Sequence, residues 1–508
     1  MKKVLYLLGH RSVLVAVSLL TQIAVFVLMI SAFSESFTQF YWVCILVSIV
    51  SALGIIADSS DPAYKIVWLV LILPFPVFGG MIYLLFGGSR HPRWLRRAMN
   101  AIDQRLLTHL KGDFKAEVLA PAGEDAVAQA RYMERWAYCP VYTNTAVDYF
   151  PSGEAYHKAM LEQLEQAQRY IFLEYFIIQE GVMWDSVLAV LKRKAAQGVD
   201  VRVMYDDMGC MFTLSKNYQK QLAEQGIRCC VFNRIVPVMS LLLNNRDHRK
   251  LCIIDGRAAF TGGVNLADEY INAKERFGHW KDSGVLVRGD AAWSMSVMFL
   301  TMWDYVNNQE EPLDSFRPAK LPVEGAQGFV QPYSDSPLDG EDVARTVYLN
   351  MISKAERYIY IPTPYLVVDS TTNAALCNAA KSGVDVRIIT PHIPDKKSVF
   401  QLTRAHYPPL LEAGVKIYEY TPGFIHAKTF VVDDHFATVG TVNLDFRSLF
   451  LHFENGVWMC NTPCIRDIKQ DFLATQKVSE KVSARQSRKQ NIFLQLYRSI
   501  LRFFAPLM

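Results

Sequence analysis

Two histidines, each followed at the same spacing by the same polar residues, are the side chains in this sequence best suited to chemistry. The two strings are HRKLCIIDGRAAFTGGVN, which begins at residue 248, and HAKTFVVDDHFATVGTVN, which begins at residue 426. Both hold Lys, Asp, Gly and Asn at the same four distances from the histidine: Lys250, Asp255, Gly262 and Asn265 in the first, and Lys428, Asp433, Gly440 and Asn443 in the second. A match at this many positions, found twice, is not expected by chance.

These residue types suit the transfer of a phosphodiester. That reaction needs an in-line nucleophile, neutralisation of phosphate charge and a proton for the leaving oxygen. His248 and His426 can supply the nucleophile and the proton, and Lys250 and Lys428 can supply the charge that Mg²⁺ provides in other enzymes. Because no carboxylate cluster with metal-ligand spacing accompanies the motifs, we predict no metal requirement and no cofactor.

The spacing also predicts how the motif residues are arranged. Residues i and i+2 lie on one face of a strand, so we expect each histidine and its lysine to point the same way. Asp255 and Asp433 are roughly 23 Å from their histidines along a straight strand. We group them with the catalytic residues, as groups that shape or cross the site and do not partner an imidazole. Asn265 and Asn443 are expected to bring donors to the phosphate.

The motifs belong to a longer internal duplication. Ala167–Ile171 (AQRYI) returns 188 residues later as Ala355–Ile359 (AERYI), and Gly198–Arg202 (GVDVR) returns unchanged 185 residues later as Gly383–Arg387. Each copy reads as apolar strand, helix, glycine and apolar strand, which is typical of an α/β fold with buried strands. We expect two α/β sandwich halves related by a pseudo-twofold axis, with one site at their shared face.

The first 88 residues are the most hydrophobic part of the chain. Three uncharged runs, Ser12–Phe33, Phe40–Ala57 and Ile66–Gly87, predict retained membrane segments. Basic residues at both ends of this region, around Lys2 and Arg90, cannot lie on the same side of the membrane if all three runs cross it. Either one segment is re-entrant and does not cross the membrane, or one of the two basic clusters does not lie on the cytoplasmic side. We expect a multi-pass cell membrane protein with a cytoplasmic catalytic part.

The composition of the chain excludes or disfavours several other classes of protein and of binding partner. The 508 residues are 51% hydrophobic and 20% charged with a net charge of +4, which excludes a disordered chain and disfavours a nucleic-acid partner. Nine scattered cysteines predict neither a disulfide framework nor a zinc set. The stretch Asn491–Met508 alternates apolar residues with Arg498 and Arg502. It is either an interfacial helix on anionic lipid or a helix packed on the globular part.

We therefore expect five regions. They are a membrane region (1–88), a basic juxtamembrane linker (89–140), a first half (141–320), a second half (321–475) and a basic amphipathic tail (476–508).

The doubled motif resembles the phospholipase D superfamily, whose signature H-x-K-x₄-D-x₆-G-[GST]-x-N is matched fully in both copies. The flanking strings NNRDHRKLCIIDGRAAFTGGVNLADEY and GFIHAKTFVVDDHFATVGTVNLDFRS, Pro364-Tyr365 and the membrane stretch Trp68–Gly87 are similar to bacterial cardiolipin synthases. The resemblance implies two phospholipase D-like halves, an inner-membrane location and reversible transfer of a phosphatidyl group between two phosphatidylglycerol molecules, giving cardiolipin and glycerol. The extra apolar segment at the N-terminus is a departure, because many relatives look two-spanning.

The resemblance also implies roles for individual residues. His248 is assigned as the nucleophile that forms a phosphatidyl-histidine, and His426 as the acid for departing glycerol and then the base for the incoming alcohol. The reverse assignment stays open because the pseudo-symmetry hides which histidine is which. Asp282 and Glu454 match acidic positions that brace the catalytic histidines. The histidines outside the repeat register are expected to be surface or packing residues: His279, His392, His406, His435 and His452.

Three other functions are weighed against this one. A hydrolytic phospholipase D, or a phosphatidyltransferase that uses a different alcohol, would carry the same motifs. A nuclease is disfavoured by the near-neutral charge and the membrane segments. A membrane scaffold with an inactive fold is disfavoured because every motif position is intact.

Overall fold

A computed structural model describes residues 24, 27, 37–58, 61–73, 83, 93–110, 116–234, 245–488 and 491–507. Nearly all of Ser12–Phe33, about half of Ile66–Gly87, and the basic residues Lys2 and Arg90 lie outside the described residues, so the expected membrane topology stays a prediction. Within the described ranges, no helix is both long enough and apolar enough to cross a membrane.

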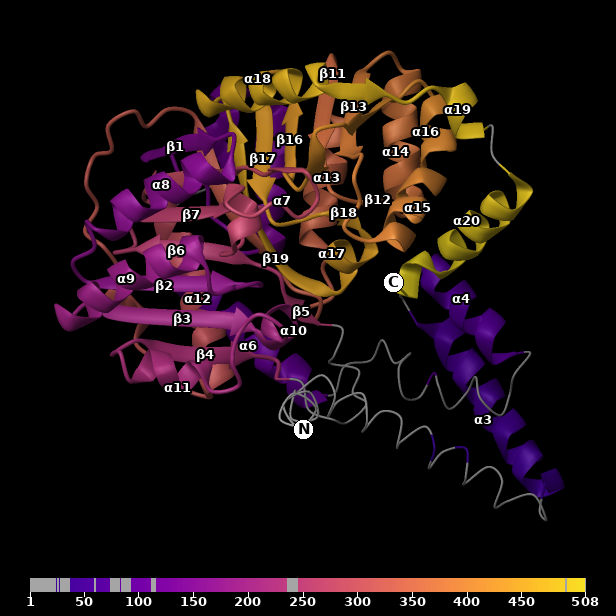
Figure 1. Cartoon of the computed structure of the whole chain (residues 1–508), viewed down its shortest axis with the longest axis horizontal. Helices are drawn as coiled ribbons and strands as arrows, with labels where there is room; N and C mark the ends of the chain where they lie inside the picture. The colour runs from indigo at the N-terminus through magenta and orange to yellow at the C-terminus, as the bar shows by residue number, and fades with distance from the viewer. Residues whose placement is uncertain are drawn as a thin grey trace.

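Two β-sheets with the same strand order form the body of the protein (Figure 1). The first has the order β1-β9-β7-β6-β2-β3-β4, and the second has the order β10-β19-β17-β16-β11-β13-β14-β20. The first sheet consists of β1 (Thr145–Phe150), β2 (Tyr170–Tyr175), β3 (Asp200–Asp206), β4 (Arg228–Phe232), β6 (Lys250–Ile254), β7 (Ala258–Gly262) and β9 (Gly284–Gly289). The second consists of β10 (Phe329–Asp335), β11 (Tyr358–Pro362), β13 (Asp385–Pro391), β14 (Lys416–Tyr420), β16 (Thr429–Val432), β17 (Phe436–Gly440), β19 (His452–Cys460) and β20 (Ser479–Lys481).

This repetition confirms the α/β fold with two similar halves that the duplication predicted. The segment GVDVR enters β3 in the first half and β13 in the second, at equivalent places in the two sheets. The second sheet gains β20, which pairs antiparallel with β14 and lies within the segment expected to be a tail.

Helices connect the parallel strands, because a parallel pair needs a crossover. The helix α9 (Val182–Ala196) joins β2 to β3, and α14 (Ser370–Lys381) joins β11 to β13 through β12 (Leu366–Val367). The other helices around the sheets are α6 (Arg93–Leu110), α7 (Glu124–Trp136), α8 (Gly153–Leu164), α10 (Asp207–Cys210), α11 (Tyr218–Ala223), α12 (Ala291–Asn307), α13 (Val343–Ser353), α15 (Lys397–Ala405), α16 (Tyr407–Glu412), α17 (Phe446–Phe450) and α18 (Cys464–Lys477).

The helix α12 joins the two halves. Every residue from Ala291 to Asp304 is buried, so this helix has no solvent face over most of its length. It packs against β6 and β9 of the first sheet and against β10 of the second. A single cluster of buried apolar side chains consequently runs through both halves.

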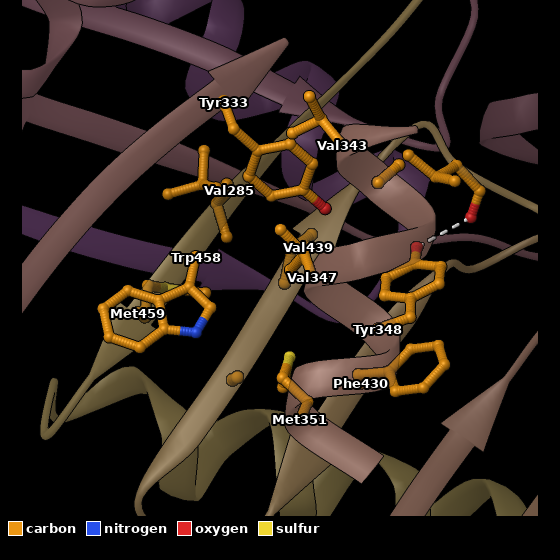
Figure 2. Packing of buried hydrophobic residues seen from close by; sticks show 14 of the residues in the cluster. Val285, Tyr333, Val343, Val347, Tyr348, Met351, Phe430, Val439, Trp458 and Met459 are labelled. Atoms are coloured by element: carbon orange, nitrogen blue, oxygen red, sulfur yellow. Dashed lines mark hydrogen bonds between the residues drawn. The ribbon is translucent and has the colours of Figure 1, made fainter. Parts of the chain in front are cut away.

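The core also fixes the loop that follows β17. The Tyr348 ring, on α13, stacks on Phe430 of β16 with ring centroids 4.1 Å apart. Its hydroxyl donates a hydrogen bond to the carbonyl oxygen of Val442 at 3.0 Å (Figure 2). Because Val442 precedes Asn443, packing behind the second motif holds the end of that motif in place.

The N-terminal helices and the C-terminus lie together. The helices α3 (Phe37–Ala57) and α4 (Pro62–Ile72) extend away from the sheets (Figure 1). The C-terminal helix α20 (Ile492–Phe504) leads into η6 (Ala505–Leu507), which contacts α4.

Candidate active site

Each motif histidine lies in a link between two strands that pair with different halves. The strand β5 (Arg246–Asp247) pairs with β19 of the second half, and after two intervening residues β6 enters the first sheet. In the other copy, β15 (Gly423–Ile425) pairs with β8 (His279–Lys281) of the first half before β16 enters the second sheet. The expectation that His-x-Lys runs along one strand face is therefore wrong. The chain crosses the seam between the halves at this point.

Both histidines are braced by the opposite half. The His248 Nδ1 lies 2.9 Å and 3.0 Å from the two carboxylate oxygens of Glu454. The His426 Nδ1 lies 2.7 Å from Asp282 Oδ2. Along the sequence Asp282 follows His248 and Glu454 follows His426, yet the structure pairs them crosswise. With each Nδ1 engaged, each Nε2 is left for chemistry.

Backbone hydrogen bonds reinforce this crossed arrangement. The His248 N–H donates to the Phe453 carbonyl at 2.9 Å, and the His426 N–H donates to the Lys281 carbonyl at 2.7 Å. Each accepting residue immediately precedes the carboxylate that braces the same histidine. The position of each imidazole along the seam is therefore fixed at two points by the other half.

The motif lysines lie buried behind the histidines. The Lys250 Nζ donates to the carbonyl oxygen of His248 at 2.6 Å, and the Lys428 Nζ donates to that of His426 at 2.5 Å. Burial lowers the pKa of Lys250 to about 7 and that of Lys428 to about 8. The charge of Lys428 also lowers the pKa of Lys250, which shows that the two copies of the motif meet.

Burial and the lysines keep both imidazoles neutral. Desolvation, followed by the charges of Lys250 and Lys428, holds the pKa of His248 well below its usual value. Burial and Lys428 lower the pKa of His426 to about 4, against the opposing effect of Asp282. Burial resists the ionisation of Asp282, but His426 and Lys428 outweigh it and lower the pKa of this carboxyl.

The two histidines line one cleft of about 770 Å³ at the seam. Asn265 and Asn443 also line it, and the expectation that they donate to the phosphate stays a prediction. The Asn265 Oδ1 accepts from the Ile177 N–H at 3.1 Å, and its Nδ2 donates to the Tyr270 hydroxyl at 2.7 Å. Since the Tyr270 ring lies 5.5 Å from the His426 ring, Asn265 positions this wall of the cleft.

Asp255 and Asp433 do not lie at this site, so grouping them with the catalytic residues was wrong. The Asp255 carboxylate accepts hydrogen bonds of 2.8 to 2.9 Å from the backbone N–H groups of residues 168–170, where β2 begins. Asp433 does the same for residues 356–358 at the start of β11, at 2.6 to 2.9 Å. Both have positive φ angles, of 52° and 55°. Each strand carries its aspartate roughly 16 Å beyond the motif lysine, to a turn that fixes the neighbouring strand.

His452 was missed by the sequence reasoning. It was expected to be a surface or packing residue, but it lines the cleft with its ring 5.5 Å from that of His248. Its Nδ1 is 3.8 Å from Glu454, and neither buried ring nitrogen has a hydrogen-bond partner among the described residues. Its counterpart is Trp280, two residues before Asp282, so no histidine appears at this position in the first copy.

The surroundings of the two histidines therefore differ. The ring of Trp280 lies 5.3 Å from that of His426. Strand pairing places Phe424 opposite Trp280, and Arg246 opposite His452. The wall beside His426 is aromatic, whereas the wall beside His248 combines the Phe176 ring with His452 and Arg246. The other histidines outside the register do not line the cleft: His279, His392, His406 and His435.

Three of these side chains have the geometry to hold a metal ion. Among the described residues, His248, His452 and Glu454 offer ligand atoms that lie within 4.8 Å of one another. A metal bound there would compete with the hydrogen bond between His248 and Glu454, which orients the imidazole. The expectation of metal-free chemistry stays a prediction.

The fold and the crossed histidine site define a phospholipase D-like protein. The model of the family described as "Cardiolipin synthase, PLD-like domain" matches residues 160–281 and 348–475, and a "Phospholipase_D-nuclease N-terminal" model matches residues 42–88. The chain belongs to the cardiolipin synthase, PLD-like domain family.

Alignments to relatives cover almost the whole chain. An uncharacterized protein of Streptococcus mutans is 44% identical over 90% of this chain and 99% of its own length. A cardiolipin synthase of a Geobacillus species is 33% identical over 96% of this chain and 99% of its own. The structure of phosphatidylserine synthase from Haemophilus influenzae has a TM-score of 0.56 at 15% identity, covering 71% of this chain and 93% of that one, and shows a shared fold.

We predict that Asp255→Asn affects stability more than chemistry. The variant weakens three charge-assisted hydrogen bonds to the start of β2, at a cost of about 2 kcal/mol. Thermal unfolding in detergent should show a lower Tm, while the turnover of the folded fraction stays near that of the wild type. Asp282→Asn is the contrasting variant, because it acts on His426 directly. A loss of turnover by Asp255→Asn with an unchanged Tm would contradict this assignment.

We also predict that binding of an anionic headgroup takes up protons. The free imidazoles are neutral and Lys250 is partly neutral near pH 7, and a bound phosphodiester raises the pKa of each group it approaches. Calorimetry with glycerophosphoglycerol at pH 7, in buffers of different ionisation enthalpy, should show an uptake on the order of one proton. The uptake should fall in His426→Gln. Proton release on binding would refute the charge assignment.

Proposed function

We propose that the protein is a cardiolipin synthase that transfers a phosphatidyl group from one phosphatidylglycerol to the glycerol hydroxyl of another, releasing glycerol. The observation that carries the proposal is the pair of imidazoles, 178 residues apart in sequence, that line one cleft and are each braced by the opposite half. Relatives named cardiolipin synthase, at 33% identity over most of the chain, support the choice of substrate.

In the first step the Nε2 of His248 attacks the phosphorus of the donor lipid. A P–N bond forms and the bond from phosphorus to the glycerol oxygen breaks. His426, which takes up a proton when the anionic headgroup binds, gives that proton to the leaving oxygen. Glu454 holds the His248 ring through Nδ1 and offsets the positive charge that develops on it. Asp282 does the same for His426.

In the second step His426, now neutral, accepts the proton of the acceptor hydroxyl. The hydroxyl oxygen attacks phosphorus, the P–N bond breaks, and His248 returns to its starting form. The two steps are chemically alike, so the reaction is reversible. The reverse assignment of the two histidines uses the same geometry and stays open.

The lysines stabilise the charge of the reacting phosphoryl group from behind the imidazoles. Their ammonium groups bond to the histidine carbonyl oxygens, so their charge lies next to the reaction centre, where burial makes it more effective. The aromatic wall formed by Phe277, Trp280 and Phe424 limits water beside His426, which favours an alcohol acceptor over hydrolysis. Phospholipase D hydrolysis, or transfer to a different alcohol, is the alternative.

We propose that residues 141–320 and 321–475 act as two half-sites that are inactive when separated. Residues 1–88 and 476–508 would hold this catalytic part on the cytoplasmic face of the cell membrane, with residues 89–140 as the linker. Both substrates and the product would then stay in the bilayer.

We predict that the purified protein converts phosphatidylglycerol alone into cardiolipin and glycerol, and that His248→Ala and His426→Ala each lower turnover at least about a thousandfold. The amount of cardiolipin formed is measured by mass spectrometry of the lipid products. His435→Asn is the matched control, because His435 bonds to the Ala122 carbonyl far from the cleft. Phosphatidic acid as the main product would show that the protein is a hydrolase and not a synthase. Substantial turnover in both alanine variants would contradict the catalytic roles proposed for the two histidines.

A further inference from the structure

The C-terminal helix α20 has the reverse of the usual amphipathic arrangement. Phe493 and Ile492 are 76% and 74% exposed, whereas Arg498 is only 7% exposed. The guanidinium of Arg498 donates two hydrogen bonds to Gln401 Oε1 of α15, at 2.7 and 3.0 Å. A helix packed on a protein in water turns its apolar side inward. This helix attaches through an arginine and presents its apolar side outward.

The outward residues form one continuous stripe. Ile492, Leu496 and Ile500 follow one another at four-residue spacing and are each about half or more exposed. On the opposite side, Leu501 packs with the buried Ala505 and continues the face that carries Arg498. The two sides of α20 therefore meet different surroundings, and the outer side is suited to an apolar one.

The inner side of α20 leads directly to the cleft. Leu501 and Ala505 pack in a small apolar cluster with Val367, Leu402 and Phe446. The four buried members, Val367, Leu402, Phe446 and Ala505, also line the cleft that holds the two histidines. An apolar wall thus runs from the seam of the two halves to the helix with the exposed stripe.

The stripe continues into the N-terminal helices. Leu507, just beyond α20, packs with Ile55 of α3 and with Trp68 and Ile72 of α4. The α3 helix exposes further large apolar side chains, including Leu46 and Leu53, which are 62% and 61% exposed. Figure 1 shows the C-terminal end of α20 approaching α4, which η6 contacts, with α3 continuing away from the catalytic halves.

From these contacts we infer that α20 lies in the surface of an anionic bilayer and holds the apolar wall of the cleft against it, so that acyl chains enter the cleft from the membrane. Charge supports this occupant, because α20 carries the exposed Arg502 and no acidic residue, and the exposed Arg485 lies shortly before it. The inference depends on the proposed function only in taking the substrate to be a lipid.

The test compares one substrate in two physical forms. Full-length protein is assayed on vesicles of long-chain phosphatidylglycerol and on short-chain phosphatidylglycerol kept monomeric below its micelle concentration. Leu496→Asp, on the outer stripe, should lower turnover on vesicles at least about tenfold and leave turnover on monomers within about twofold. Ser499→Asp introduces the same charge on the polar flank of the same helix and should change neither rate by more than about twofold.

Each contrary outcome overturns the inference. Equal losses on both substrate forms in Leu496→Asp, or an altered Tm, would make α20 a structural helix only. No loss on vesicles would mean that the stripe does not meet the membrane. A change of oligomeric state in sedimentation would assign the stripe to a second copy of the chain. If the wild type forms phosphatidic acid and no cardiolipin, the proposed function fails while the comparison of vesicles and monomers still tests the surface.

Discussion

The crossed hydrogen bonds between imidazoles and carboxylates are the interaction on which the active site depends. His248 takes its brace from Glu454 and His426 takes its brace from Asp282, in each case across the seam. Neither half can orient its own histidine. The duplication is therefore more than two copies of one site, because a complete site exists only where the halves meet, and α12 and the shared core hold them there.

Burial sets the charge state of this centre. Two lysines, two histidines and two carboxylates lie together out of water, where an isolated charge is costly and a paired one is tolerated. The carboxylates offset the lysines, and the imidazoles stay neutral. Such a site favours the binding of an anion. The negative charge of a bound phosphodiester raises the pKa of the imidazoles, so that one of them can hold a proton.

Much of this could be predicted from the sequence, because the repeat marks the same residue types at the same spacing. Two α/β halves, the His and Lys pairs and Asn265 follow from the repeat, whereas the bracing carboxylates, Asp282 and Glu454, came from the family resemblance. The crossed pairing was not, since it depends on how β5 and β15 leave their own halves. Asp255 and Asp433 were misassigned because a motif read along the chain does not show that a strand carries its last residue away from the site. His452 was missed because Trp280 occupies its place in the other copy.

In this mechanism both imidazoles act on one phosphorus. A structure of the full chain with vanadate, which adopts the geometry of a phosphoryl group in transfer, tests it most directly. We expect vanadium bonded to the Nε2 of one histidine, with the Nε2 of the other within about 3 Å of an apical oxygen. Vanadate held by one histidine alone, with the second imidazole out of reach, or bound elsewhere in the cleft, would contradict it.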